Sequence, residues 1–189
     1  MAGRNVIIAI GSPRRNGNST ALAQEAASGV REAGGTARVY RLHDLAIRPC
    51  RACDNCQKNR NFSCVQVDDM NAIYAELAKA DGLLIASPVY WFTMSAQTKL
   101  FVDRLYAFVG PDGHGLAGKR IGVILTYGDA DAVRSGAVNA LRSFQDACRF
   151  IEAPLVGEVY GSGSEPGEVK ENQALMREAW ELGRKMAAD

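Results

Sequence analysis

Short runs of apolar residues recur along the chain, and stretches with a helical spacing of apolar residues separate them. The runs are rich in Val, Ile and Leu, which is typical of strands buried on both faces of a parallel sheet. We expect five such strands, over residues 6–10, 37–42, 81–87, 120–126 and 154–160. The segment 37–42 is the most polar and should lie at an edge of the sheet, and Pro88 should end the third strand.

Helices are predicted between and after these strands, over residues 19–33, 68–80, 95–109, 132–150 and 165–188. In the third of them, Phe101, Leu105 and Phe108 recur at i, i+4 and i+7 and mark its buried face. Residues 46–68 lack either pattern and should be irregular, and residues 161–164 should form a flexible loop.

The alternation of strands and helices predicts an α/β fold in which helices cover both faces of a parallel sheet. Five strands fit the doubly wound, flavodoxin-like order 2-1-3-4-5, which creates a ligand site at the carboxyl ends of the first and third strands. The length of 189 residues suits one domain, and no repeat divides it. We therefore expect residues 1–189 to form a single domain, with a cysteine-containing loop, residues 46–68, inserted after the second strand.

Charge and hydropathy exclude several classes of partner. The net charge of +1 gives no basic excess, so we expect neither nucleic acid nor an anionic membrane as a partner. The chain start runs directly into the first strand without the apolar stretch of a signal peptide, and no apolar run approaches the length of a membrane span. The expected location is the cytoplasm.

The loop between the first strand and the first helix is a candidate phosphate site. Residues 11–20 read GSPRRNGNST and contain two arginines, several hydroxyl and amide side chains, two glycines and no acid. A helix N-terminus offers free N–H groups and a partial positive charge, and the hydroxyls of Ser12, Ser19 and Thr20 can add donors. The alternative is that Asn18 or Ser19 serves as a plain helix cap.

Two further loops follow the third and fourth strands. Tyr90, Trp91 and Phe92 suit a flat apolar ligand, although packing against a helix or a dimer partner is an alternative for each. The fourth strand ends beside them at Tyr127 and Gly128, where glycine allows a close backbone approach. All three loops meet at one edge of the predicted sheet, an arrangement that predicts an FMN site.

Together these motifs resemble the NADPH-dependent FMN reductase family of flavodoxin-like proteins. The resemblance rests on residues 11–14 (GSPR), 17–20 (GNST) and 87–92 (SPVYWF), with Lys99 and Asp103-Arg104, and it covers most of the chain. It implies FMN as the cofactor and NAD(P)H as a co-substrate. The spacing of Lys99 and Asp103 also fits a simple ion pair on one helix face.

The resemblance also implies which residues contact FMN. The implied phosphate contacts are Ser12, Arg14, Asn18, Ser19 and Thr20. The implied isoalloxazine contacts are Pro88, Val89, Tyr90, Trp91, Phe92, Tyr127, Gly128 and Asp129.

Four of the five cysteines, Cys50, Cys53, Cys56 and Cys64, lie within fifteen residues. In a reducing compartment this clustering indicates metal or redox chemistry rather than a disulfide framework. Their spacing resembles the compact motif of the iron–sulfur flavoprotein branch of the same family, which implies a [4Fe–4S] cluster. Zinc, free thiols or an adventitious disulfide are the alternatives. The fifth, Cys148, lies in a predicted helix and should be a buried apolar side chain.

Basic residues surround the four clustered cysteines and would offset the charge of a thiolate-ligated cluster. These residues are Arg48, Arg51, Lys58 and Arg60.

These observations lead to three candidate functions. The first is an FMN-dependent iron–sulfur flavoprotein that exchanges electrons with reduced nicotinamide or a one-electron partner. The second is a cluster-free NAD(P)H:FMN or quinone reductase, and the third is a redox-sensing flavin-binding module. We expect a small-molecule or protein electron acceptor and, from the resemblance, a homodimer or homotetramer. Because the flavin carries the chemistry, no side chain is expected to act as a catalytic acid or base.

Overall fold

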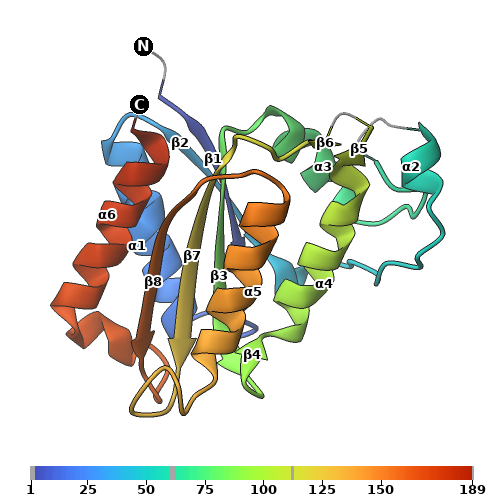
Figure 1. Ribbon diagram of the computed structural model, residues 1–189. Helices are drawn as coiled ribbons and strands as arrows, with labels where there is room; N and C mark the ends of the chain where they lie inside the picture. Colours follow the sequence, from blue (N-terminus) through green and yellow to red (C-terminus); the bar gives the residue numbers. More distant parts are fainter. Residues whose placement is uncertain (1–2, 60–62, 112, 189) are drawn as a thin grey trace.

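The computed structural model of the protein describes residues 3–59, 63–111 and 113–188. Its main sheet contains the parallel strands β1 (Asn5–Ile10), β2 (Thr36–Arg41), β3 (Gly82–Tyr90), β7 (Arg120–Tyr127) and β8 (Leu155–Ser162). Their spatial order is β2-β1-β3-β7-β8 (Figure 1). This arrangement confirms the predicted α/β fold and the order 2-1-3-4-5.

Helices cover both faces of this sheet. The long helices are α1 (Asn18–Glu32), α3 (Met70–Lys79), α4 (Ala96–Arg104), α5 (Ala137–Phe150) and α6 (Gln173–Ala187). The sheet lies between α1 and α6 on one side and α3, α4 and α5 on the other (Figure 1). Alternate residues of β1 pack into the two layers, Ile7 and Ala9 into one, and Val6, Ile8 and Ile10 into the other. The strands are therefore buried on both faces, as their continuous apolar runs predict.

The prediction that Pro88 ends the third strand is wrong. β3 continues to Tyr90 and then turns back into the short strand β4 (Thr93–Met94), which pairs with it antiparallel. Gly11 N–H donates to Ala86 O at 2.8 Å, so Ala86 faces β1, and Pro88 faces the same side two residues later. β1 has already ended at Ile10, so the missing N–H of Pro88 removes no hydrogen bond from the sheet.

Four other predicted boundaries also differ. The last predicted helix, 165–188, begins only at Gln173, where α6 starts. α5 begins at Ala137 rather than near residue 132, because residues 131–136 form turns that end at Gly136, where φ is +77°. β8 extends to Ser162, into the predicted loop 161–164. The third predicted helix is divided into α4 and a 3₁₀ turn, Leu105–Phe108, but Phe101 and Phe108 are fully buried as expected.

The remaining elements are short. The helix α2 (Asn55–Asn59) lies within the segment 46–68 that was expected to be irregular. The strands β5 (Val109–Gly110) and β6 (Gly113–His114) form a small separate hairpin. The remaining 3₁₀ turns are Leu42–Asp44 and Glu168–Glu171. Among the described residues, no helix is long and apolar enough to span a membrane.

Candidate functional site

The carboxyl ends of β1, β3, β7 and β8 surround a cavity of about 210 Å³. Nine of the predicted FMN contacts line it, namely Ser12, Arg14, Asn18, Ser19, Pro88, Val89, Tyr90, Tyr127 and Gly128. Gly17, Thr126, Gly163 and Ser164 line it too and were not predicted. The structure therefore brings together loops that are separated by up to about 150 residues in the sequence.

The start of α1 points a set of free hydrogen-bond donors at this cavity. No side chain caps the helix, and its first turn contains no acid. The first N–H groups of a helix have no partner within the helix, and they carry a partial positive charge. The Ser19 hydroxyl is fully buried beside them and has no hydrogen-bond partner among the described residues. A buried hydroxyl without a partner is unfavourable unless a ligand completes it.

Three of the predicted phosphate contacts form hydrogen bonds within the protein. The Ser12 hydroxyl accepts from Arg14 N–H at 3.2 Å and donates to Arg14 O at 3.3 Å. The Thr20 hydroxyl donates to Arg14 O at 3.0 Å and does not line the cavity. The Asn18 amide donates to Gly163 O at 2.8 Å and to Glu165 O at 3.0 Å, and so ties the loop after β1 to the loop after β8. Asn18 and Thr20 thus shape this loop, and four of the five predicted phosphate contacts, Ser12, Arg14, Asn18 and Ser19, line the cavity.

Arg14 supplies positive charge at the mouth of the cavity. Its neighbour Arg15 lies 3.4 Å from Asp44, whereas Arg14 forms no ion pair with any residue that the structure describes. A guanidinium group without an acidic partner, beside the helix start, favours a doubly charged phosphate.

A second hollow of about 240 Å³ adjoins the first, and the two share Val89, Tyr127 and Gly128. Trp91, Phe92 and Asp129 line this second hollow and not the first, whereas the predicted isoalloxazine contacts Pro88 and Tyr90 line only the first. Arg134 and Ser135 complete it and were not predicted. Burial raises the pKa of Tyr127, the side chain between the two hollows.

The aromatic turn between β3 and β4 has an unusual backbone. Trp91 and Phe92 have φ values of +51° and +66°, in the left-handed region that side chains with a Cβ seldom adopt. Trp91 is 90% exposed and Phe92 56% exposed, so burial does not explain the conformation. Contacts with the start of α5 hold it, because the Asn139 amide donates to Phe92 O at 3.1 Å.

A buried hydroxyl network supports the floor of the site and was not predicted. The Ser95 hydroxyl donates to Gly11 O at 2.8 Å, and Ser95 N–H donates to the Ser87 hydroxyl at 3.0 Å. Ser95 also caps α4 by accepting from Thr98 N–H. A Cβ on Gly11 would lie 1.8 Å from the Thr98 hydroxyl, so glycine is required there. This network fixes the end of β1 against the end of β3.

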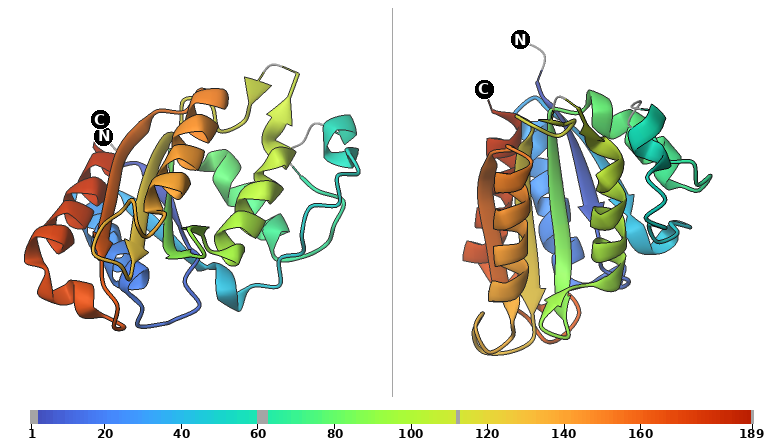
Figure 2. Two further views of the ribbon diagram at one scale, coloured as in Figure 1. Left: turned by 60° about the horizontal axis from the view of Figure 1, so that its bottom comes forward. Right: turned by 45° about the vertical axis from the view of Figure 1, so that its right-hand side comes forward.

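The four clustered cysteines lie in a segment at the side of the domain, next to α4 (Figures 1 and 2). Each sulfur accepts an N–H hydrogen bond. Ala52 N–H donates to Cys50 Sγ at 3.4 Å, Gln66 N–H to Cys64 Sγ at 3.5 Å, and the Gln57 amide to Cys56 Sγ at 3.5 Å. Hydrogen bonds from the backbone and side chain of Asn55, with the charge of Arg51, lower the pKa of the Cys53 thiol.

The cysteine sulfurs are free thiols and do not converge. Cys50 and Cys53 are exposed, and Cys56 and Cys64 are half-buried. Within residues 3–59, 63–111 and 113–188, no group of three Cys, His, Asp or Glu side chains is placed to hold a metal ion. Arg60, one of the basic residues expected near the thiols, lies outside the described residues. The buried position of Cys148 is as predicted.

A buried ion pair closes the base of the cysteine segment. Arg104 donates to both carboxylate oxygens of Asp68, at 2.6 and 3.2 Å, and to Arg48 O at 2.7 Å. Both side chains are at most 3% exposed. The Gln66 amide donates to Pro49 O at 3.0 Å. We call these contacts the basal clamp, because they join the two ends of the segment. The Arg104–Asp68 pair was not predicted, whereas the predicted ion pair Lys99–Asp103 also forms, at 2.6 Å.

Comparison with known proteins adds three findings. The chain matches the family model described as NADPH-dependent FMN reductase over residues 4–165. It is 30% identical over 185 residues to an iron-sulfur flavoprotein of Methanocaldococcus jannaschii, covering 94% of this chain and 92% of that one. It is also 30% identical over 183 residues to an iron-sulfur flavoprotein of Archaeoglobus fulgidus, covering 94% of this chain and 76% of that one.

A similar solved structure is the NAD(P)H:quinone oxidoreductase from Methanothermobacter marburgensis. The TM-score is 0.75 at 19% identity, and the match covers 98% of both chains. At this identity the comparison concerns the fold, and it agrees with the flavodoxin-like topology.

Proposed function

The chain belongs to the NADPH-dependent FMN reductase family and is an FMN-dependent oxidoreductase, and from this premise we propose where the cofactor binds and how electrons pass. FMN binds at the carboxyl edge of the sheet, with its phosphate at the start of α1. Reduced nicotinamide supplies the electrons, and a small-molecule or protein acceptor receives them.

The observation that carries this proposal is the unpartnered Ser19 hydroxyl beside the uncapped start of α1. The residues present fit a phosphate, because this loop supplies hydroxyl and N–H donors, no acidic side chain, and the Arg14 guanidinium group, which has no acidic partner among the described residues. Val89, Tyr90 and Tyr127 line the rest of the cavity, next to Gly128, and they suit the edge and face of a flat ring.

When bound, FMN supplies hydride and single-electron chemistry. The protein's own residues would bind the cofactor, orient it and shield it. Ser12, Arg14, Ser19 and the N–H groups of α1 hold the phosphate, and the Ser87–Ser95–Gly11 network keeps the two strand ends at a fixed separation. The second hollow, lined by Trp91 and Phe92, adjoins this cavity through Val89, Tyr127 and Gly128 and would receive a second planar substrate.

We further propose that Cys50, Cys53, Cys56 and Cys64 hold a [4Fe–4S] cluster. Two observations support it. The two relatives named above are iron-sulfur flavoproteins, and all four sulfurs accept N–H hydrogen bonds, which stabilise thiolates and tune clusters. As they stand, however, the described sulfurs do not gather into a metal site, so cluster binding requires the segment to close. We assign no electron-transfer step to the cluster.

The open arrangement of the thiols favours a second candidate, a cluster-free NAD(P)H:FMN or quinone reductase. One experiment separates the two. The protein is purified anaerobically, and iron, zinc, acid-labile sulfide and FMN are measured before and after iron–sulfide reconstitution. Bleaching of the flavin absorbance by NADPH or NADH then tests the reductase activity.

We expect one FMN per chain and flavin bleaching by reduced nicotinamide. Four irons and four sulfides per chain would support the cluster, whereas flavin alone, with turnover unchanged by Cys53→Ser, would support the cluster-free reductase. A purified chain that neither contains nor takes up FMN would refute the proposed site. Light scattering on the same sample tests the proposed homodimer or homotetramer.

A further inference from the structure

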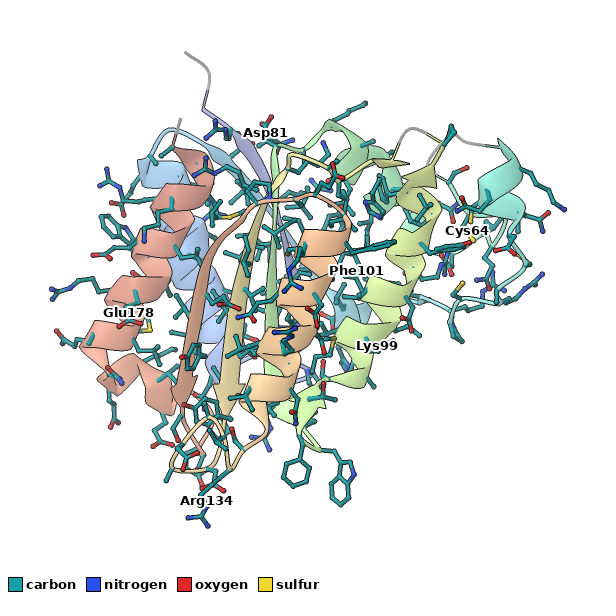
Figure 3. The ribbon with its side chains drawn as sticks, in the orientation of Figure 1. Cys64, Asp81, Lys99, Phe101, Arg134 and Glu178 are labelled. Atoms are coloured by element: carbon teal, nitrogen blue, oxygen red, sulfur yellow. The ribbon has the colours of Figure 1, made fainter. Side chains whose placement is uncertain are left out.

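A separate hollow of about 400 Å³ lies at the amino ends of the strands, on the opposite edge of the sheet from the candidate FMN site. Figure 3 shows Asp81 at this end of the molecule and Arg134 at the other. The charged residues that line the hollow are Arg4, Asp81, Lys119 and Arg120. Three cations thus face one carboxylate.

Two of these charged groups already have structural partners. Lys119 Nζ donates to Ala78 O at 3.2 Å and to Ala80 O at 2.5 Å, and so caps the carboxyl end of α3. Burial lowers the pKa of Lys119, and the nearby charge of Asp81 opposes that shift. Asp81 Oδ2 accepts the Asn5 N–H at 2.7 Å. Lys119 and Asp81 are therefore accounted for.

The hydrogen bonding of Arg4 and Arg120, in contrast, is incomplete. Arg4 Nη1 and Arg120 Nε are buried and have no hydrogen-bond partner among the described residues. If Arg4 and Arg120 capped a helix end as Lys119 caps α3, these two nitrogens would donate to carbonyl oxygens, and neither of them does so within the described part of the chain. Burial lowers the pKa of Arg120, and the charge of Arg4 lowers it further, so the two guanidinium groups repel each other across the hollow. A buried donor without an acceptor and a like-charge pair are both unfavourable.

We propose that this hollow, the amino-edge site, binds a small multivalent oxyanion such as a phosphate group, held by the guanidinium groups of Arg4 and Arg120. An oxyanion in the hollow would accept from these guanidinium groups after the side chains rotate to bring their buried, unpartnered N–H groups to it, and it would separate the two positive charges. Guanidinium groups match such anions in both geometry and charge. The site is independent of FMN, because none of its lining residues lies at the carboxyl edge.

The test uses inorganic phosphate as the probe and isothermal titration calorimetry as the measurement. The protein is saturated with FMN first, so that phosphate cannot occupy the start of α1, and the buffer otherwise contains only chloride at constant ionic strength. Arg4→Gln and Arg120→Gln remove the proposed contacts. Arg31→Gln, an exposed arginine near the end of α1, is the matched control, and Arg14→Gln reports any binding at the FMN phosphate site.

We expect phosphate binding to weaken at least tenfold in Arg4→Gln and Arg120→Gln and to persist in Arg31→Gln and Arg14→Gln. At ten times its Kd, phosphate should raise the Tm of the wild type by about 3–6 °C. Without phosphate, Arg120→Gln should melt at a temperature equal to or above that of the wild type, because the repulsion is removed. Arg120→Lys, which keeps the charge, should retain part of the binding if Arg120→Gln fails to fold.

The proposal is wrong if the wild type binds no phosphate, or if all four variants bind it equally. It is also wrong if Arg14→Gln alone abolishes binding, since phosphate then occupies the FMN site. These outcomes do not depend on the proposed function, because a chain that fails to bind FMN still gives a readout in the Arg14→Gln background.

Discussion

Replacement of Ser19 by alanine should stabilise the FMN-free protein and weaken FMN binding at the same time. The Ser19 side chain is 1% exposed, and its hydroxyl has no hydrogen-bond partner among the described residues. An unsatisfied buried polar group destabilises a protein by about 1–3 kcal/mol. Removing the Ser19 hydroxyl recovers this free energy, but the small void left by the oxygen cancels part of the gain. We expect the free energy of unfolding of the FMN-free chain to rise by about 1 kcal/mol, which raises its Tm by about 2–4 °C.

The effect on FMN has the opposite sign. A hydrogen bond to a charged phosphate contributes about 1.5–3 kcal/mol, so Ser19→Ala should raise the Kd for FMN by about 10- to 100-fold. Riboflavin lacks the phosphate, and its weaker binding should not change. Thermal unfolding of the FMN-free protein and quenching of flavin fluorescence on titration measure the two quantities.

Two variants on the same helix serve as controls. The Ser28 hydroxyl bonds to Gln24 O at 3.3 Å on an exposed face, so Ser28→Ala should leave both quantities unchanged. The Thr20 hydroxyl bonds to Arg14 O, so Thr20→Val should destabilise the FMN-free protein by about 1 kcal/mol. If Ser19→Ala lowers the stability of the FMN-free chain, or binds FMN as tightly as the wild type, the assignment of this hydroxyl to the phosphate is refuted.

Three further predictions concern the clamp, the aromatic turn and the buried thiol. Burial raises the pKa of Asp68, but hydrogen bonds from Arg104 and neighbouring N–H groups outweigh it and hold the pKa below its ordinary value. The stabilisation by the Arg104–Asp68 pair is therefore present above about pH 4 and is lost as the pH falls further. Asp68→Asn should lower the free energy of unfolding at pH 7 by about 3–5 kcal/mol and should reduce its decrease at acid pH, as urea unfolding at each pH would show. Gly136→Ala adds a Cβ 2.5 Å from that of Phe92 at a positive φ, so it should lower the Tm and disturb the aromatic turn, with weaker flavin binding in the same titration; an unchanged Tm would contradict the described turn. Burial raises the pKa of the Cys148 thiol to about 11, so in the metal-free protein at pH 8 iodoacetamide should label the four clustered cysteines quickly and Cys148 only after unfolding, as mass spectrometry of the labelled peptides would reveal.

Much of the fold follows from local pattern. The strands are buried on both faces, so their apolar runs are continuous, and the order of the sheet follows from the alternation with helices. The errors occur where tertiary pairing overrides a local rule. A proline ends a strand only where the neighbouring strand needs the N–H that proline lacks. Whether β1 extends as far as Pro88 cannot be deduced from the residues around Pro88.

The candidate site shows the same division. The residues of the loop after β1 could be predicted because a helix start with many donors and no acid is a local feature. The contribution of Gly163 and Ser164 could not, because it depends on the Asn18 amide bonding to a loop about 145 residues away. The separation of Trp91 and Phe92 from Tyr90 depends on two left-handed residues, and nothing in an aromatic run predicts that conformation.

The basal clamp makes the cysteine segment a module that can vary without affecting the sheet. Arg104 bonds to both Arg48 and Asp68, and Gln66 bonds to Pro49. The segment therefore leaves the sheet and helices and returns to them at the same place. The entropy of closing a loop changes only slowly with its length once the ends are fixed. Shortening, lengthening or exchanging the residues between those ends should therefore leave the flavodoxin-like core foldable, and a metal-binding insert could be gained or lost on this scaffold while the flavin site stays intact.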